Sequence, residues 1–263
     1  MRARLWFALN SLLVLVGLLS AWHFAVILLK IQPYMLPGPA AVGAAAVRRF
    51  PALMESLWLT TEAAATGLAG SIVAGVAMAL VFAQWRGLRR LFFPYTILLQ
   101  TVPIVAIAPL IIMWVGSGVT AVALITFIIC LPPIIANTTQ GLISVDANLI
   151  DLFLMHKASR MQVLFKLRLP HALPNLLVGL RISAGIAVIG AIIGELFASS
   201  SRVGVGGLGY SITYAYSQLE TDYLFALVAA ATALGFAFFF MVMFLEWYFL
   251  HNWHESSRAD VPE

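Results

Sequence analysis

Three glycines in the stretch GVGGLG, Gly204, Gly206 and Gly209, have the GxGxxG spacing of a dinucleotide-binding loop. Such a loop binds a pyrophosphate only where a strand precedes it and a helix follows it. Here the stretch lies between two long apolar segments, so we interpret it as a re-entrant or gate loop that includes Gly207 and ends at Tyr210. The ATP-binding pattern GxxxxGK[ST] occurs nowhere in the chain, so any ATP hydrolysis must come from a partner protein.

Four charged residues stand in or beside apolar segments: Glu62, Arg181, Glu195 and Glu246. A charge at the centre of a membrane helix costs roughly 2.5–3.5 kcal/mol, so each needs a partner or a function. Glu195 could line a solute pathway or hold neighbouring helices together, and Glu62 is a second candidate pathway residue. We expect Arg181 to snorkel or to brace a cytoplasmic loop, and Glu246 to lie at the membrane interface.

Metal chemistry has little support in the sequence. Cys130 is the single cysteine and lies in an apolar run, where buried packing is the simplest interpretation. His251 and His254 flank a tryptophan near the end of the chain and are typical of a juxtamembrane anchor. We predict no metal site and no cofactor, and we find no cluster of nucleophile, base and acid that a membrane-embedded enzyme would need.

The composition identifies the kind of protein that positions these residues. Of 263 residues, 62% are hydrophobic and 10% charged, whereas soluble domains have about a quarter charged residues. The net charge of +4 is spread between apolar segments rather than clustered, which argues against nucleic-acid binding. The chain is therefore predicted to be an all-α integral membrane protein.

Six segments are long and apolar enough to cross a bilayer, which takes about 20 residues per helix. They are residues 5–29, 57–83, 94–115, 119–137, 176–199 and 223–250. We expect a first helix and an outer connection (1–56), in which residues 36–56 form a turn and a short surface helix. A core (57–250) and a short cytoplasmic tail (251–263) follow. Most Lys and Arg fall on one side if both ends are cytoplasmic, so the six-helix bundle is predicted to be N-in and C-in.

The longest inner connection, residues 138–175, contains DLFLMHKASRMQVLFKLRLPHALP from Asp151 to Pro174. Ser159 can cap a second helix with Gln162 three residues on, and Pro170 and Pro174 are expected to stop that helix and start the fifth span. The pattern predicts a helix-turn-helix on the cytoplasmic face.

This loop resembles the cytoplasmic coupling loop of the permease subunits of ABC importers. Asp151 fills the acidic position of that motif, Leu167 the aliphatic position, and Leu169 and Pro170 the Leu-Pro. Leu152 and Phe153 replace two alanines and Lys157 replaces a glycine. Further runs extend the resemblance over most of the chain: LPGP, QTVPIVAIAPLIIMWVGSG, IIGELFASS, GLGY and TDYLFA. They are similar to the branch that takes up nitrate, sulfonates, taurine, thiamine precursors and riboflavin.

The resemblance implies a multi-pass subunit of the plasma (inner) membrane that conducts a small solute and is not itself an enzyme. Its expected partners are ABC ATPase subunits, an extracytoplasmic solute-binding protein and a second permease copy, identical or different. The resemblance also assigns ATPase coupling to a set of residues in the loop: Asp151, Lys157, Ala158, Ser159, Arg160, Leu167, Leu169 and Pro170. A thiamine-pyrimidine precursor or riboflavin-like solute fits better than an anion, since acidic residues and no deep lysine occupy the spans. The alternative is a secondary transporter that uses Glu62 and Glu195 for ion coupling.

Overall fold

The computed structural model describes residues 2–198 and 206–250, and all regular structure within them is helical. Gly204, His251, His254 and the predicted tail lie outside the described residues. The helices are α1 (Arg2–Leu28), α2 (Pro39–Arg48), α3 (Phe50–Gln84), α4 (Arg86–Thr101), α5 (Ile104–Val115), α6 (Val119–Ile143), α7 (Ala147–Met155), α8 (Arg160–Val163), a π-helix (Leu164–Arg168), α9 (Leu169–Phe197), α10 (Leu208–Ser217) and α11 (Thr221–Leu250). The all-α prediction is confirmed for these residues.

Four predicted spans, the second, fourth, fifth and sixth, correspond to long apolar helices: α3, α6, α9 and α11. The predicted span 94–115 is not one helix, because α4 and α5 meet at a bend of 100°. Val102 is extended and Pro103 precedes α5, as expected where proline disfavours the helical conformation of the residue before it. Of α1, the described side chains include the apolar stretch Leu13–Leu28, and the count of six spans stays a prediction.

The core forms where α6 packs between α3 and α9. Gly67 of α3 lies so close to α6 that a Cβ there would stand 2.5 Å from the carbonyl oxygen of Ala123. Across the other face of α6, the Ser183 hydroxyl donates to the carbonyl of Cys130 at 2.9 Å. Small residues and interhelical hydrogen bonds are what hold helices together where lipid removes the hydrophobic drive. Cys130 is fully buried and not in a disulfide, as the sequence suggested.

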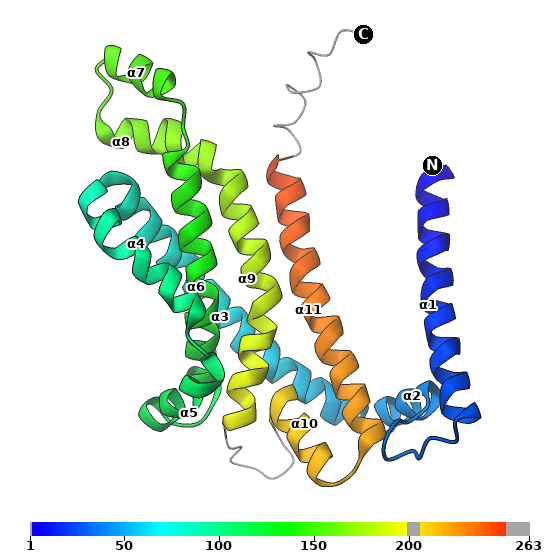
Figure 1. Cartoon of the computed structure of the whole chain (residues 1–263). Helices are drawn as coiled ribbons and strands as arrows, with labels where there is room; N and C mark the ends of the chain where they lie inside the picture. Colours follow the sequence, from blue (N-terminus) through cyan, green and yellow to red (C-terminus); the bar gives the residue numbers. More distant parts are fainter. Residues whose placement is uncertain (1, 199–205, 251–263) are drawn as a thin grey trace.

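The ends of the bundle differ in character (Figure 1). The start of α1, the end of α11 and the α7–α8 hairpin lie at one end, whereas α2, α5 and α10 lie at the other. The short helix expected within 36–56 is α2, which begins with Pro39. Both ends of the described chain therefore share a side with the predicted coupling loop, and the cytoplasmic location of that side stays a prediction.

The prediction that Pro170 and Pro174 stop the second hairpin helix is wrong, although α9, the fifth predicted span, does begin with Pro170 in its first turn. From Arg160 the chain stays helical through α8, the π-helix and α9, a run of 38 residues up to Phe197. The reason is local: Pro170 falls in the first turn of α9, directly after the π-helix, where a missing N–H costs little. The chain turns there from the hairpin into α9 without losing its helical connection (Figure 1).

Candidate functional site

The α7–α8 hairpin is built by local capping. The Asp146 side chain accepts the backbone N–H of Asn148 at 2.8 Å and so starts α7. Ser159 and Gln162 form the predicted capping box, with both of its hydrogen bonds present, at the start of α8. Because both helices carry their own N-caps, the hairpin has a defined shape before any partner binds.

The turn between the two helices is a left-handed helix cap centred on Lys157. Lys157 has φ of 56°, a conformation that normally favours glycine. Its N–H donates to the Leu154 carbonyl at 2.9 Å, and the N–H of Ala158 donates to the Phe153 carbonyl at 3.0 Å. This is the Schellman pattern, in which a positive φ lets two donors satisfy the last carbonyls of α7. The glycine-like position inferred for Lys157 is thus confirmed as a backbone requirement.

The predicted coupling residues separate into two groups. Asp151, Lys157, Ser159 and Arg160 are exposed on the hairpin, with Ala158 half-buried beside them. The other three, Leu167, Leu169 and Pro170, are half-buried where the hairpin joins α9. The first group can meet a partner, and the second attaches the hairpin to the bundle.

Sequence reasoning missed the apolar surface of α7. No residue of α7 is buried, and its exposed side chains include Leu149, Leu152 and Met155, the last 81% exposed. Their spacing of three residues places them near one another on the helix surface. The available signal was the run of apolar residues in this loop, whose charged residues alone had drawn attention.

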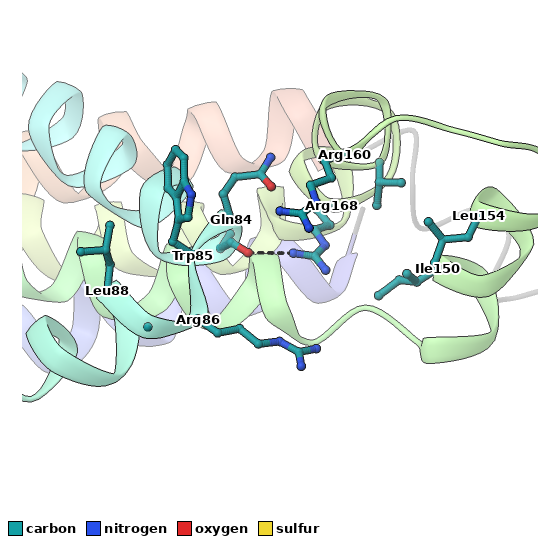
Figure 2. Close-up of a pocket in the computed structure, with 11 residues that line it drawn as sticks. Gln84, Trp85, Arg86, Leu88, Ile150, Leu154, Arg160 and Arg168 are labelled. Carbon is teal, nitrogen blue, oxygen red and sulfur yellow. Dashed lines mark hydrogen bonds between the residues drawn. The ribbon is translucent and has the colours of Figure 1, made fainter.

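Arg168 fastens the hairpin to α3. Its Nη1 donates to the backbone carbonyl of Ala83 at 2.9 Å, as Figure 2 shows. This carbonyl belongs to the last turn of α3, whose carbonyls have no partner within the helix. The sequence identified Arg168 only as a positive charge on the inner side.

At the other end of the bundle, Glu195 of α9 lies in a buried polar cluster and is 6% exposed. Its Oε2 accepts the Thr60 hydroxyl of α3 and the Gly209 N–H of α10, both at 2.9 Å. Thr60 also accepts the Leu208 N–H at 2.8 Å. The carboxylate therefore lies at the N-terminus of α10, where a negative charge is stabilised by the helix dipole. Of the two roles left open for Glu195, this geometry matches holding helices together.

The glycines of the predicted gate loop pack against this cluster. A Cβ at Gly207 would stand 2.0 Å from Oε1 of Glu195, and one at Gly209 would stand 2.4 Å from the Ile192 carbonyl oxygen. Gly206 lies against the ring of Tyr210, which stacks on Tyr214. These glycines therefore allow close helix contact, and neither Gly207 nor Gly209 has a positive φ.

Glu62 and Glu195 are not brought together. Glu62 is exposed on α3, and no hydrogen bond or ion pair joins it to Glu195 within the described chain. The ion-coupling alternative gains no support from this arrangement. No group of three or more His, Cys, Asp or Glu that could bind a metal is present among the described residues.

Arg181 and Glu246, the other two charges singled out in the spans, form an interhelical ion pair, and two further ion pairs lie at the opposite end. Arg181 of α9 donates to Glu246 of α11 at 2.8 Å. Arg181 therefore braces α11, and not the cytoplasmic loop that the sequence suggested. At the opposite end, Arg48 pairs with Asp222 at 2.8 Å, and Arg49 pairs with Glu220. Hydrogen bonding to Glu220 raises the pKa of Arg49, which keeps this contact charged. The sequence had counted Arg48 and Arg49 only as charges that orient the chain.

These features define a multi-pass membrane bundle with an exposed, preformed hairpin at one end and a buried polar cluster at the other. Residues 71–253, well over half of the chain, match the family described as binding-protein-dependent transport system inner membrane component, and the chain belongs to this family. It is 32% identical over 244 residues to the formylaminopyrimidine transport permease protein ThiX of Halalkalibacterium halodurans, covering 91% of this chain and 94% of that one.

Two further relatives have the same kind of name. The riboflavin transport system permease protein RibX of Chloroflexus aurantiacus is 32% identical, over 92% of this chain and 89% of its own. The taurine transport system permease protein TauC of Escherichia coli is 29% identical, over 86% and 83%. A chain of the MetNI methionine ABC transporter, in an inward-facing conformation, superposes with a TM-score of 0.64 at 20% identity, covering 77% of this chain and 98% of that one. The protein is thus an ABC importer permease of the plasma membrane.

Proposed function

We propose that this permease subunit is driven by an ABC ATPase that binds the exposed surface of the α7–α8 hairpin. The observation that carries the proposal is the unbroken helical run from Arg160 to Phe197. Its first residues form the second arm of the hairpin, and its last turns contain Glu195, which is hydrogen-bonded to α3 and α10. A displacement imposed on the hairpin would therefore be carried along α9 to the polar cluster at the opposite end.

The chemistry of α7 supports a protein partner. Leu149, Leu152 and Met155 are exposed beyond the ends of α6 and α9, where Figure 1 shows α7 as the outermost helix of this end. Apolar side chains that extend past the spans are stabilised when a partner covers them. Asp151 and Arg160 add charges of both signs, which specify orientation more than affinity.

The test is copurification of the ATPase with variants of the hairpin. Met155→Ser and Asp151→Lys are expected to lower the recovered ATPase and uptake together. The matched control for ATPase recovery is Tyr216→Ser, which removes a large exposed side chain, 72% accessible, from α10 at the opposite end. Unchanged ATPase recovery and uptake in both hairpin variants would contradict the docking role.

For the solute, we infer a thiamine-pyrimidine precursor or a riboflavin-like molecule. Two relatives at 32% identity are named for formylaminopyrimidine and riboflavin, whereas the taurine relative is 29% identical. Glu62 is exposed on α3, and an acidic side chain in a span does not favour an anion. Uptake of radiolabelled formylaminopyrimidine and riboflavin, compared with taurine in the same cells, tests this assignment. Transport of taurine alone would refute it.

We further propose that two permease subunits form one pathway, with N-in and C-in topology, an extracytoplasmic binding protein on the α10 side and ATPases on the hairpin side. Mass spectrometry of the purified complex would show one permease species in two copies, or this chain with a different permease. Cysteine labelling at Lys30 and Met155, in inverted and right-side-out vesicles, tests the topology. Labelling of both positions from the same side would contradict it.

A further inference from the structure

A basic pocket opens between the α3–α4 junction and the hairpin, with a volume of about 700 Å³. Figure 2 shows Arg86, Arg160 and Arg168 directed toward this space, with Trp85 on one side and Leu154 on the other. Arg86 belongs to α4 and the other two to the helical run that follows the hairpin turn. Among the described residues, none of those that line the pocket is acidic.

The arginine charges in the pocket lack carboxylate partners. Within the described residues, the ion pairs lie elsewhere and include neither Arg86, Arg160 nor Arg168. Arg168 uses one nitrogen to bind the Ala83 carbonyl, while its buried Nε has no partner. Three guanidinium groups around one space repel one another unless an anion lies between them, and their planar forks match phosphate oxygens.

The start of α4 adds further donors to the same pocket. Trp85 is the N-cap without a side-chain hydrogen bond, and Arg89 is the first residue whose N–H bonds back, to the Trp85 carbonyl. The N–H groups of Arg86, Gly87 and Leu88 therefore have no partner within α4. Free N–H groups at a helix start favour an anion.

An apolar stripe begins at the rim of the pocket. Leu88 lines the pocket, and Leu91, Tyr95 and Leu98 follow it along α4 at helical spacing, all of them exposed. Residues spaced in this way lie on one face of a helix. A soluble phosphate would gain nothing from such a stripe, whereas an acyl chain would bury it.

We propose that the basic pocket binds the phosphate group of a phospholipid whose acyl chain lies along this stripe of α4. Basic pockets at the ends of membrane helices suit anionic headgroups, which lie at the depth where the spans end. The site joins α3, α4 and the hairpin, so a bound lipid would hold the hairpin against the bundle. The lipid site does not depend on which solute is transported or on which side of the membrane the hairpin lies, because both leaflets contain phosphate headgroups.

The test is retention of phosphatidylglycerol by the full chain, reconstituted in nanodiscs with phosphatidylcholine and measured by native mass spectrometry after delipidation. The test variant is Arg86→Gln with Arg160→Gln. The matched control is Arg90→Gln with Lys166→Gln, which removes two positive charges from exposed positions of the same region that do not line the pocket. We expect about 30-fold weaker retention in the test variant, the equivalent of about 1 kcal/mol per arginine, and less than threefold in the control.

A second arm identifies the source of the phosphate. Millimolar inorganic phosphate is expected to leave phosphatidylglycerol bound, because it cannot cover the stripe. Displacement of the lipid by inorganic phosphate at that concentration would show a soluble-phosphate site and overturn the proposal. Equal retention in the test and control variants would overturn it as well. Tryptophan fluorescence of each purified variant checks that the fold is intact.

Discussion

Replacing Lys157 with glycine should stabilise the hairpin. Lys157 holds φ of 56°, and a side chain in this left-handed region costs roughly 1–2 kcal/mol because its Cβ crowds the following carbonyl. Glycine removes that cost, but its greater conformational freedom in the unfolded chain reduces the stabilisation by about 0.4–1 kcal/mol. The expected net gain is about 0.7 kcal/mol, a shift of roughly threefold in the equilibrium between closed and open turn.

Amide hydrogen exchange is the direct assay. The N–H groups of Lys157 and Ala158 are bonded to the carbonyls of Leu154 and Phe153, so their exchange rates report opening of the turn. In Lys157→Gly, exchange at these two amides should slow by roughly threefold, while amides in the middle of α6 should not change. ATPase coupling should be preserved or tightened.

Lys157→Ala separates backbone conformation from charge. It removes the same ammonium group as the glycine variant but keeps a Cβ in the left-handed region, so it should not slow exchange. If alanine and glycine slowed exchange equally, the gain would come from loss of positive charge and the conformational argument would be refuted.

The outer cluster, the ion pair and the hairpin cap give three further predictions. Gly207→Ala should lower stability by about 1–3 kcal/mol in thermal unfolding because its Cβ would overlap a buried carboxylate, whereas Gly185→Ala, with no atom within 4 Å, should be neutral; equal melting temperatures would contradict this. Arg181→Met should destabilise more than the double variant Arg181→Met with Glu246→Leu, since the single change leaves an unpaired carboxylate in the span; a double-mutant cycle of denaturation measures the difference, and additivity would refute the pairing. Ser159→Ala should cost about 1 kcal/mol in local stability of α8, seen as faster proteolysis of the hairpin, and unchanged cleavage would argue against the cap.

Much of the local structure could be predicted because it depends on neighbours in the chain. The capping box of Ser159 and Gln162 follows from two residues three apart, and it is present. The glycine-like position of Lys157 came from the resemblance to the coupling loop, and its φ is positive. The apolar segments behind α3, α6, α9 and α11 could be read directly, since a bilayer imposes one length on any helix that spans it.

The effects of the prolines were predicted less well, because they depend on the backbone geometry around each proline. Pro103 does break a helix, in the middle of a segment read as one span, whereas Pro170 does not break the run from α8 into α9. Both are prolines in apolar surroundings. The difference is that Pro170 follows a π-helix and falls in a first turn, and composition does not encode this position.

The amino-acid sequence by itself determined that this is an all-helical membrane protein, that Ser159 caps the second hairpin helix and where the hairpin turns, because propensity, capping and hydropathy act over short distances. Only the tertiary structure decided the partners of the charges. Glu195 bonds to Thr60 and to the start of α10, and Arg181 pairs with Glu246, across separations of 135 and 65 residues for the two side-chain pairs. Such contacts depend on which helix faces meet, and a buried charge accepts whichever donor the packing brings within reach.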